Sequence, residues 1–406
     1  MKKNRIISIA VLITLIIYFS SCTENTIPYD LSDSNLNLDT VTVSSIMGGT
    51  FLSPPLMGST NGIYFGNTNG FNNIFSLIQF SSLSISGAVW TYSLLDTAIT
   101  IDSLVITFTA SEDTLLTTSE FELFYFPEGG DSLFSESESN YLNITEANVA
   151  NSVPVGRSTF MQELPDSTES VYPKLSFSIE DKDDILNFIA DTTDSQNRTF
   201  MLKNVDTINE IVSINSRESV DFPIINVYYR VGEDTLHSVF FSIKDLTIVE
   251  PRELTENDMG NISVGRATGL KSIIQFDLKD IPIDSSAMVI KSAELIFNTI
   301  NDLTSEDYEI SAAILEDSVS ISNYWEIDED QYSVSLDLLM TGTFEDNQLK
   351  MEVRSFLQGV NTGSYSNLGL KLYGSTDSNP YQSVNLILDP NNLDNNPYLK
   401  IIYVKL

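Results

Sequence analysis

Basic residues, histidine, cysteine and tryptophan are all scarce in this sequence. Its 406 residues include 21 lysines and arginines against 56 aspartates and glutamates, a formal net charge of −35 at pH 7. Nucleic-acid binding needs a basic surface that neutralises phosphates, so this balance argues against nucleic acid as a partner. The acidic surplus is typical of a solvated surface that keeps an exported protein soluble.

Histidine occurs once, at His237, which excludes histidine-rich metal sites. A lone histidine at the start of a strand is more typical of a structural than of a catalytic residue, so His237 is predicted to be structural, which argues against a Ser-His-Asp triad. The sequence strings of nucleophile elbows, phosphate-binding loops and zinc-binding helices do not occur either. Carboxylate pairs that hydrolyse glycosides stay open, but 56 acidic residues bring some carboxylates together in any fold. We therefore expect a protein that is not an enzyme, with a carboxylate-based polysaccharide-degrading enzyme as the minor alternative.

The only cysteine, Cys22, ends a segment with the pattern of a bacterial lipoprotein signal. Two lysines and an arginine precede an apolar run at 6–19, which is shorter than the ~20 residues of a membrane-spanning helix. The run leads into the letters FSSC, which resemble a lipobox. Residues 1–21 are therefore predicted to be a signal peptide and Cys22 the lipidated residue, with a plain secretory signal and an incidental cysteine as the alternative.

A lipid on Cys22 leaves no thiol for disulfides, metal binding or nucleophilic catalysis, so stability must come from packed cores. Residues 22–38 are polar, have little periodicity and are predicted to be a tether. By analogy with lipoproteins that lack an inner-membrane retention signal, we expect the chain at the outer membrane or cell surface, held there through the lipid.

The rest of the chain contains one domain twice. The string SLIQF at 76–80 returns as SIIQF at 272–276, and a G-x-x-x-G motif precedes each copy. Other matches follow in the same order along both halves. They join 99–108 to 289–297, 121–125 to 308–312, 175–179 to 349–353, 200–204 to 368–372, 222–229 to 396–403, and the lead-in 38–43 to 233–239. The predicted domains are 39–232 and 233–406.

The matched blocks have the composition and period of β-strands. They are short, rich in β-branched and aromatic residues, and bounded by Gly, Asn, Asp and Ser, while helical periodicity is limited to 183–193. This pattern predicts an all-β protein of two tandem jelly-roll-like antiparallel β-sandwich domains. Residues 127–170 make the first copy longer and are predicted to form loops.

Each copy runs from the G-x-x-x-G motif through the S-[LI]-I-Q-F and I-x-S-x-x-[IL]-x-F strands to a Pro-led strand ending in tyrosine. This order resembles the DNRLRE-type family of carbohydrate-binding β-sandwich modules. NSRES at 215–219 is similar to the family's closing motif, and NYWEIDED at 323–330 to its Trp-acidic segment. The chain also resembles exported lipoproteins of the Bacteroidota.

The chain departs from that family pattern at several positions, including Phe188 and Phe356 where a tryptophan is expected. Gln79 and Gln275 stand where the family often has a basic residue, and the second copy lacks the Arg-Glu pair of NSRES. The resemblance still implies modules that bind carbohydrate. Sugar rings stack on exposed aromatic side chains, for which core packing is the alternative role. The candidates are Trp90, Tyr324, Trp325, Tyr365 and Tyr381.

Acidic runs at 180–184 and 328–331 offer oxygen ligands to Ca²⁺, but neither has the spacing of an EF-hand. Solvated loops are the favoured interpretation, so no cofactor is expected, with structural Ca²⁺ as the alternative.

Together these patterns predict a non-catalytic, lipid-anchored envelope protein whose two modules bind glycan or surface polymer. The alternative is a structural or adhesion accessory of an outer-membrane or surface complex. The expected partners are accordingly a polysaccharide or an envelope protein, besides the membrane that holds the lipid.

Overall fold

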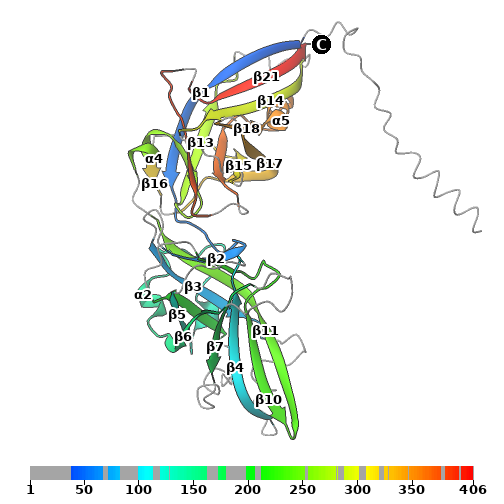
Figure 1. The fold of residues 1–406 in the computed structure, drawn as a ribbon. Helices are drawn as coiled ribbons and strands as arrows, with labels where there is room; N and C mark the ends of the chain where they lie inside the picture. The colour runs from blue at the N-terminus through cyan, green and yellow to red at the C-terminus, as the bar shows by residue number, and fades with distance from the viewer. Residues whose placement is uncertain are drawn as a thin grey trace, which may run out of the picture.

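The structure, a computed structural model, is an all-β protein of two domains (Figure 1). The predicted signal peptide, Cys22, the tether up to residue 37, Trp90 and the segment 183–193 lie outside the residues that it describes. Those residues are 38–66, 72–82, 99–112, 119–127, 129–161, 172–179, 198–205, 212–251, 255–279, 281, 288–300, 308–319, 324–327, 329–345, 347–375, 380–392 and 395–405.

Eight antiparallel strands of the first domain close into a barrel. Their order around the ring is β10 (Ile224–Val231), β11 (Asp234–Glu250), β3 (Asn72–Phe80), β8 (Thr199–Asn204), β5 (Glu120–Tyr125), β6 (Val153–Met161), β7 (Lys174–Ile179) and β4 (Ile99–Thr109). A separate antiparallel pair, β2 (Gly62–Phe65) and β9 (Val212–Asn215), lies beside the end of β4.

The second domain repeats this ring strand for strand. Its order is β21 (Tyr398–Lys405), β1 (Leu38–Leu52), β13 (Leu270–Phe276), β19 (Leu370–Gly374), β15 (Ile310–Leu315), β17 (Val334–Glu345), β18 (Gln348–Glu352) and β14 (Met288–Asn298). β12 (Ile262–Gly265) and β20 (Ser383–Leu386) repeat the β2–β9 pair, and β16 (Tyr324–Glu326) adds in parallel to β1. The identical order shows that the two halves are copies of one domain.

The first strand of each copy belongs to the other copy's barrel. β1 pairs with β21 and β13 of the second barrel, whereas β11 pairs with β10 and β3 of the first (Figure 1). The first barrel is therefore the continuous segment 53–250, inserted between β1 and the rest of the second barrel. The division into 39–232 and 233–406 misplaces these two strands, because a repeat shows which strands correspond but not which barrel each one joins.

Strand pairing also shifts part of the alignment between the copies. Ser76 faces Leu202, and the matching Ser272 faces Leu372, so the block at 200–204 corresponds to 370–374 rather than 368–372. The matches of 121–125 and 38–43 move by two residues in the same way. Side chains alternate with period two along a strand, so such a shift leaves the apolar pattern unchanged.

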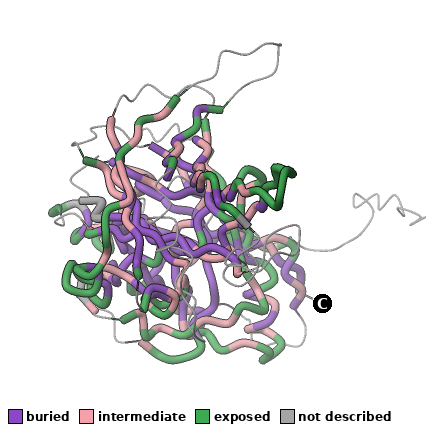
Figure 2. Tube along the Cα trace, turned by 90° about the horizontal axis from the view of Figure 1, so that it is seen from below, coloured by how far each residue is buried: buried purple, intermediate pink, exposed green. Residues whose placement is uncertain are grey.

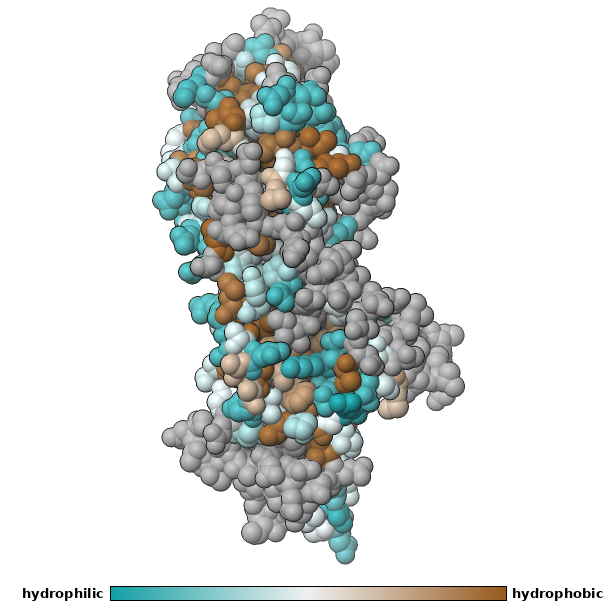
Figure 3. Space-filling model, turned by 90° about the vertical axis from the view of Figure 1, so that its left-hand side faces the viewer, coloured by the Kyte–Doolittle hydropathy of each residue, from teal (hydrophilic) through white to brown (hydrophobic). Residues whose placement is uncertain are grey.

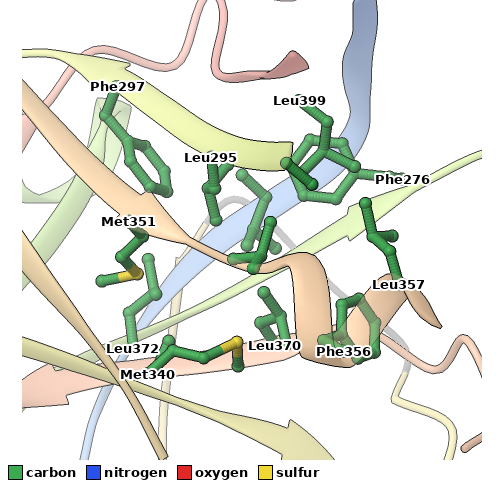
Figure 4. Close-up of a cluster of buried hydrophobic side chains, with 14 of the residues drawn as sticks. Phe276, Leu295, Phe297, Met340, Met351, Phe356, Leu357, Leu370, Leu372 and Leu399 are labelled. Atoms are coloured by element: carbon green, nitrogen blue, oxygen red, sulfur yellow. The ribbon is translucent and has the colours of Figure 1, made fainter. Parts of the chain in front are cut away.

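Apolar side chains from the strands form one buried core in each barrel. Figure 2 shows the buried residues toward the middle of the molecule and the exposed ones mostly at its edges. In the second barrel, Leu295 of β14 faces Met351 of β18 and Phe297 faces Leu349. The close-up shows Leu295, Phe297 and Met351 with their neighbours (Figure 4). Phe356 and Leu357 of α5 (Arg354–Thr362) complete this core. The alternating apolar residues of the matched blocks therefore form the cores, as the strand pattern predicts.

The described part of the extra segment contains regular secondary structure, contrary to the prediction of loops at 127–170. It contains η1 (Gly130–Ser132), α2 (Glu146–Val149) and the barrel strand β6. Its apolar side chains pack on the outer face of β3 and β11 and form a second small core with them. Those contacts include Phe134, Ile144 and Val149 from the segment and Leu77 and Leu246 from the strands. The Ser- and Glu-rich composition concealed these few apolar anchors.

The two barrels contact each other through a small apolar cluster of Met57, Val249, Ala267 and Tyr381, with Tyr64 at its edge. Beside it, the chain that leaves β1 touches the second G-x-x-x-G turn, where Ser53 N donates to Gly269 O across 2.9 Å. Gly269 has a φ of +69°, and a Cβ atom there would lie 2.1 Å from Ser53 O. Only glycine permits both this backbone conformation and this approach.

Candidate functional site

An open pocket of about 550 Å³ lies on the first barrel, where the segment between β9 and β10 crosses β11. Arg217 and Glu218 come from the NSRES motif, and Phe222 precedes β10. Strand β11 contributes the remaining lining residues. The lining residues are Arg217, Glu218, Phe222, Phe241, Ser242 and Ile243.

A β-bulge in β11 provides a backbone hydrogen-bond acceptor for Arg217. The pairing of β11 with β3 skips Ile243, because Ser242 faces Phe80 and Lys244 faces Gln79. A bulged residue leaves the regular ladder and its backbone groups become available to other partners. The carbonyl oxygen of Ile243 accepts a hydrogen bond of 2.6 Å from Nη1 of Arg217.

Two carboxylates hold the other side of the Arg217 guanidinium. Its Nε lies 2.6 Å from Glu218 Oε1 and 3.3 Å from Glu136 Oε1. The hydrogen bond to Glu218 raises the pKa of Arg217 above its ordinary value, although partial burial opposes the charge. Glu136 belongs to the extra segment of the first copy, so this segment helps to build the site.

Asp245 lies beneath the pocket and is 1% exposed. Its Oδ2 accepts from the backbone N–H of Arg217 at 2.7 Å, and its own N–H donates to Glu136 Oε1 at 3.0 Å. Burial raises the pKa of Asp245 to about 8, so the neutral acid is favoured at pH 7. Burial also raises the pKa of Glu136, although the Asp245 N–H and the charge of Arg217 oppose the shift.

Two phenylalanine rings form the apolar wall of the pocket. Phe222 and Phe241 are half-buried, with ring centroids 6.1 Å apart and planes at 62°. Next to them, Ser242 is 5% exposed, and its Oγ has no hydrogen-bond partner among the residues that the structure describes. A buried hydroxyl without a partner is rare in folded proteins.

In the second barrel, a hydrogen bond occupies the position that is equivalent to the pocket. Ser45 N donates to Pro397 O at 2.8 Å as Ser242 N donates to Pro223 O at 3.0 Å, so the two serines correspond. Asn396, which precedes Pro397, donates from Nδ2 to Ser45 Oγ at 2.9 Å. In the first barrel the residue before Pro223 is Phe222, which has no amide to reach Ser242.

The buried acid is also specific to the first barrel. Gly48 faces Ile274 on β13 as Asp245 faces Ile78 on β3. A Cβ atom on Gly48 would lie 3.1 Å from Leu388 Cδ1, so a leucine side chain covers this position. The residue after Leu388 is Asp389, in the place of Arg217. The second copy therefore has an apolar contact where the first has Arg217 and Asp245.

A second crevice, of about 680 Å³, lies where the barrels meet. Its walls come from the crossing segment at 54–56, the extra segment at 137–143, and Glu329 and Asp330 of the second barrel. Oδ2 of Asp330 lies 2.6 Å from the Nζ atoms of both Lys271 and Lys371. These ions stabilise the wall of the crevice.

Of the predicted aromatic candidates, Tyr381 is 4% exposed and packs edge-on against Tyr64 with ring centroids 5.7 Å apart. It is therefore a packing residue between the barrels and presents no face to a sugar. Tyr365 is half-buried against the second core, and its ring lies over Gly359. Neither residue lines the pocket on the first barrel.

The structure describes less of the remaining predicted residues. Tyr324 and Trp325 lie in β16, paired with Thr50 and Phe51 of β1, and only their backbone is described. Cys22 and Trp90 lie outside the described residues. Their predicted roles stay predictions.

The sequence alone does not indicate that Phe222, Phe241, Ser242, Asp245 and Glu136 form a site. Phenylalanine is most often a buried core residue, so its presence in a strand does not predict a partly exposed ring. The presence of NSRES in one copy alone was the available signal. The other three residues gave none, because their meeting depends on the bulge in β11 and the fold of the extra segment.

In the part of the chain that the structure describes, no three His, Cys, Asp or Glu side chains group as metal ligands, and no helix has the length and hydropathy to span a membrane. The predicted structural His237 lies on β11 with its ring stacked on Tyr228, at 5.9 Å between centroids.

Comparison with known proteins gives no family model that matches the chain and no curated protein with a significantly similar sequence.

Proposed function

We propose that the chain is a non-catalytic, lipid-anchored protein of the bacterial cell envelope, and that it binds glycan or another surface polymer. The pocket on the first barrel carries this proposal. It combines two half-buried aromatic rings with an Arg217–Glu218 ion pair at its rim. Aromatic faces pack on the C–H face of a sugar, while a guanidinium donates to hydroxyl groups and a carboxylate accepts from them.

The contacts of the carboxylates favour binding over catalysis. Glu218 is hydrogen-bonded through Oε1 to Arg217 and through Oε2 to Ser216 Oγ at 3.0 Å. Glu136 and Asp245 hold backbone N–H groups beneath the pocket. These bonds stabilise one arrangement of the rim, which suits recognition of a ligand that leaves unchanged.

The strand order supports an outward orientation of this pocket. The predicted tether leads directly into β1 of the second barrel, and the first barrel extends from the opposite side of that barrel (Figure 1). A lipid on Cys22 would hold the second barrel nearer the membrane and the first barrel farther out. We include in this proposal the relationship to jelly-roll carbohydrate-binding modules that the sequence resemblance implies.

Affinity electrophoresis of the mature chain carrying Cys22→Ser, in gels containing neutral or acidic polysaccharides, tests the proposal. We expect retardation in at least one gel, reduced by the matching free oligosaccharide. Unchanged mobility in every gel would contradict glycan binding.

One observation favours the alternative role as a structural or adhesion accessory. Equivalent strands of the two barrels expose apolar side chains, Met161 of β6 at 63% and Leu336 and Leu339 of β17 at 79% and 54%. The pairing of β15 with β17 skips 336–338, which places Leu336 outside the ladder. On the face shown in Figure 3, hydrophobic residues lie among hydrophilic ones. Recovery from native membranes of one stoichiometric protein partner, lost on Leu336→Asp and Leu339→Asp substitution, would support this role.

A further inference from the structure

The two barrels have the same strand order, and one of the places where they differ is the pocket on the first barrel. In the second barrel, Asn396 bonds Ser45 and Leu388 covers Gly48. In the first barrel, the corresponding position is an open pocket of about 550 Å³. That volume lies within the range of ligand-binding pockets, roughly 300–1,000 Å³.

The two barrels satisfy their buried polar groups differently at this position. In the second barrel, Nδ2 of Asn396 donates to Ser45 Oγ, and Oδ1 of Asn396 has no partner among the described residues. In the first barrel, Ser242 is 5% exposed and its Oγ has no partner among those residues. Phe222 stands in the place of Asn396 and presents a half-buried ring, so the first copy has an aromatic surface where the second has a hydrogen bond.

The polar rim matches a pair of neighbouring hydroxyl groups. Arg217 uses Nε for Glu218 and Nη1 for Ile243 O, and its Nη2 has no hydrogen-bond partner in the described part of the chain. Each Glu218 oxygen accepts one hydrogen bond and keeps a further lone pair. A guanidinium donor beside a carboxylate acceptor can serve two adjacent hydroxyls, one as acceptor and the other as donor.

The charges around the pocket favour a neutral ligand. Arg217 repels a cation at the rim, and the carboxylates of Glu218 and Glu136 offset its attraction for an anion. The chain as a whole carries −35, which further disfavours the approach of an anionic polymer. A sugar without charged substituents avoids both penalties.

We infer that this pocket binds one hexopyranose unit of a neutral glycan, and that only the first barrel of each chain does so. The C–H face of the sugar packs against Phe222 and Phe241. Two adjacent hydroxyls of the ring contact Nη2 of Arg217 and the carboxylate of Glu218. The inference rests on the proposed function, to which it adds the ligand class, the contacts and the limit of one such site per chain.

Saturation-transfer NMR and titration with the methyl glycosides of glucose, galactose, mannose and N-acetylglucosamine test this inference on the mature chain carrying Cys22→Ser. The first variant is Phe222→Asn, which supplies the first barrel with the amide that closes the second. We expect it to weaken binding of the preferred glycoside at least about tenfold, because it removes the ring and fills the space beside Ser242.

Glu218→Gln is the second variant and retains the shape of the rim. Loss of one charge-assisted hydrogen bond to a hydroxyl is expected to weaken binding about tenfold. The matched control is Glu122→Gln, which removes a comparable carboxylate 3.1 Å from Arg157 on the outside of the same barrel. The control should bind as the unsubstituted chain does. If Phe222→Asn does not fold, Glu218→Gln and its control decide the matter.

The outcomes separate the inference from the function on which it rests. Retardation by a neutral polysaccharide with unchanged glycoside affinity in both pocket variants would overturn the inference and leave glycan binding intact. Equal weakening by Glu122→Gln would also overturn it, since a general charge effect would then explain the loss. Absence of binding to every polysaccharide and glycoside would overturn both. Stronger retardation by acidic than by neutral polysaccharides in the affinity gels would overturn the ligand class.

Discussion

The hydroxyl of Thr50 lies 3.0 Å from the hydroxyl of Ser272, although the two residues are 222 positions apart. The same pair recurs in the first barrel, where Thr247 Oγ1 lies 3.3 Å from Ser76 Oγ. Both threonines also accept a backbone N–H, from Ser263 at 2.9 Å and from Tyr64 at 3.3 Å. Thr50 belongs to β1 and Thr247 to β11, the two strands that each join the barrel of the other copy. These contacts show that β1 and β11 pack closely in those barrels.

The placement of β11 predicts which fragments fold. Residues 53–250 contain every strand of the first barrel and should give a folded monomer with a cooperative thermal transition. Residues 39–232 lack β11, so β10 and β3 each lose one of their two neighbours and the barrel stays open, and this fragment should be unfolded or aggregated. Circular dichroism and size-exclusion chromatography of the two fragments compare them directly.

A complementation experiment provides the control for that comparison. Co-expressed fragments 38–232 and 233–406 each lack one strand that the other supplies, and we expect them to elute as a 1:1 complex. Two independent, folded monomers from these fragments would show that β1 and β11 return to their own copies and would contradict the strand order.

Replacement of Thr50 by valine should destabilise the second barrel. Valine keeps the shape of the side chain but removes the acceptor of Ser263 N–H and the donor to Asn261 O at 2.8 Å. Unsatisfied buried groups make the expected loss about 1–3 kcal/mol in the free energy of unfolding. Thr247→Val is the matched control in the first barrel. Calorimetry should show that Thr50→Val lowers the transition temperature of the second barrel and that Thr247→Val lowers that of the first. An effect of Thr50→Val on the first barrel alone would contradict this prediction.

Asp245 predicts a loss of stability as pH rises. Burial raises its pKa to about 8 in the folded chain, against an ordinary value of 3.8. Between about pH 4 and pH 8 the unfolded chain has released a proton that the folded chain retains, so this group's contribution to stability falls with rising pH. Below pH 4 both states hold the proton and the contribution is complete.

Asp245→Asn removes this titration and keeps an acceptor for Arg217 N–H. Urea unfolding at several pH values should therefore show the variant gaining stability relative to the unsubstituted chain from pH 4 to pH 8. Asp102→Asn, at the exposed ion pair with Arg230, is the control and should give no such trend. A constant difference between Asp245→Asn and the unsubstituted chain across this range would show that Asp245 is ionised in the folded state.

Asp330 should show the opposite pH dependence. Burial opposes its ionisation, but the ammonium groups of Lys271 and Lys371 outweigh burial and hold its pKa below the ordinary value. Its contribution to stability is therefore present above about pH 4 and is lost as pH falls through the lowered pKa. Burial lowers the pKa of Lys371, although Asp330 opposes that shift.

Asp330→Asn leaves Lys371, which is 7% exposed, without a carboxylate. We expect a loss of about 2–3 kcal/mol at pH 7, since removing one partner leaves a buried charge, and the partly open site moderates the effect. Asp277→Asn, beside the exposed Lys279 at 3.7 Å, should cost less than about 1 kcal/mol. Chemical denaturation measures both; equal effects of the two substitutions would contradict a special role of the Asp330 pair.

Much of the fold was readable in the order of residues because side-chain alternation is a local property. The echo of SLIQF in SIIQF, the I-x-S strand and the Pro-led strand each identified a strand that recurs in both barrels, and their apolar positions form the cores. The pattern of these strands therefore determined the fold class and the duplication. It also marked NSRES as present in one copy only.

The tertiary structure decided which barrel each lead-in strand joins and what surrounds Arg217. β1 and β11 have equivalent neighbours in the two barrels, so the alternation of their side chains does not indicate which barrel each strand joins. The connections through 53–61 and beyond Glu250 determine the barrel. Likewise Glu136, Arg217 and Asp245 are far apart in sequence and meet only because the bulge in β11 and the extra segment place them together. Contacts between distant residues depend on how the whole chain closes, which is why the pocket became visible only in the folded protein.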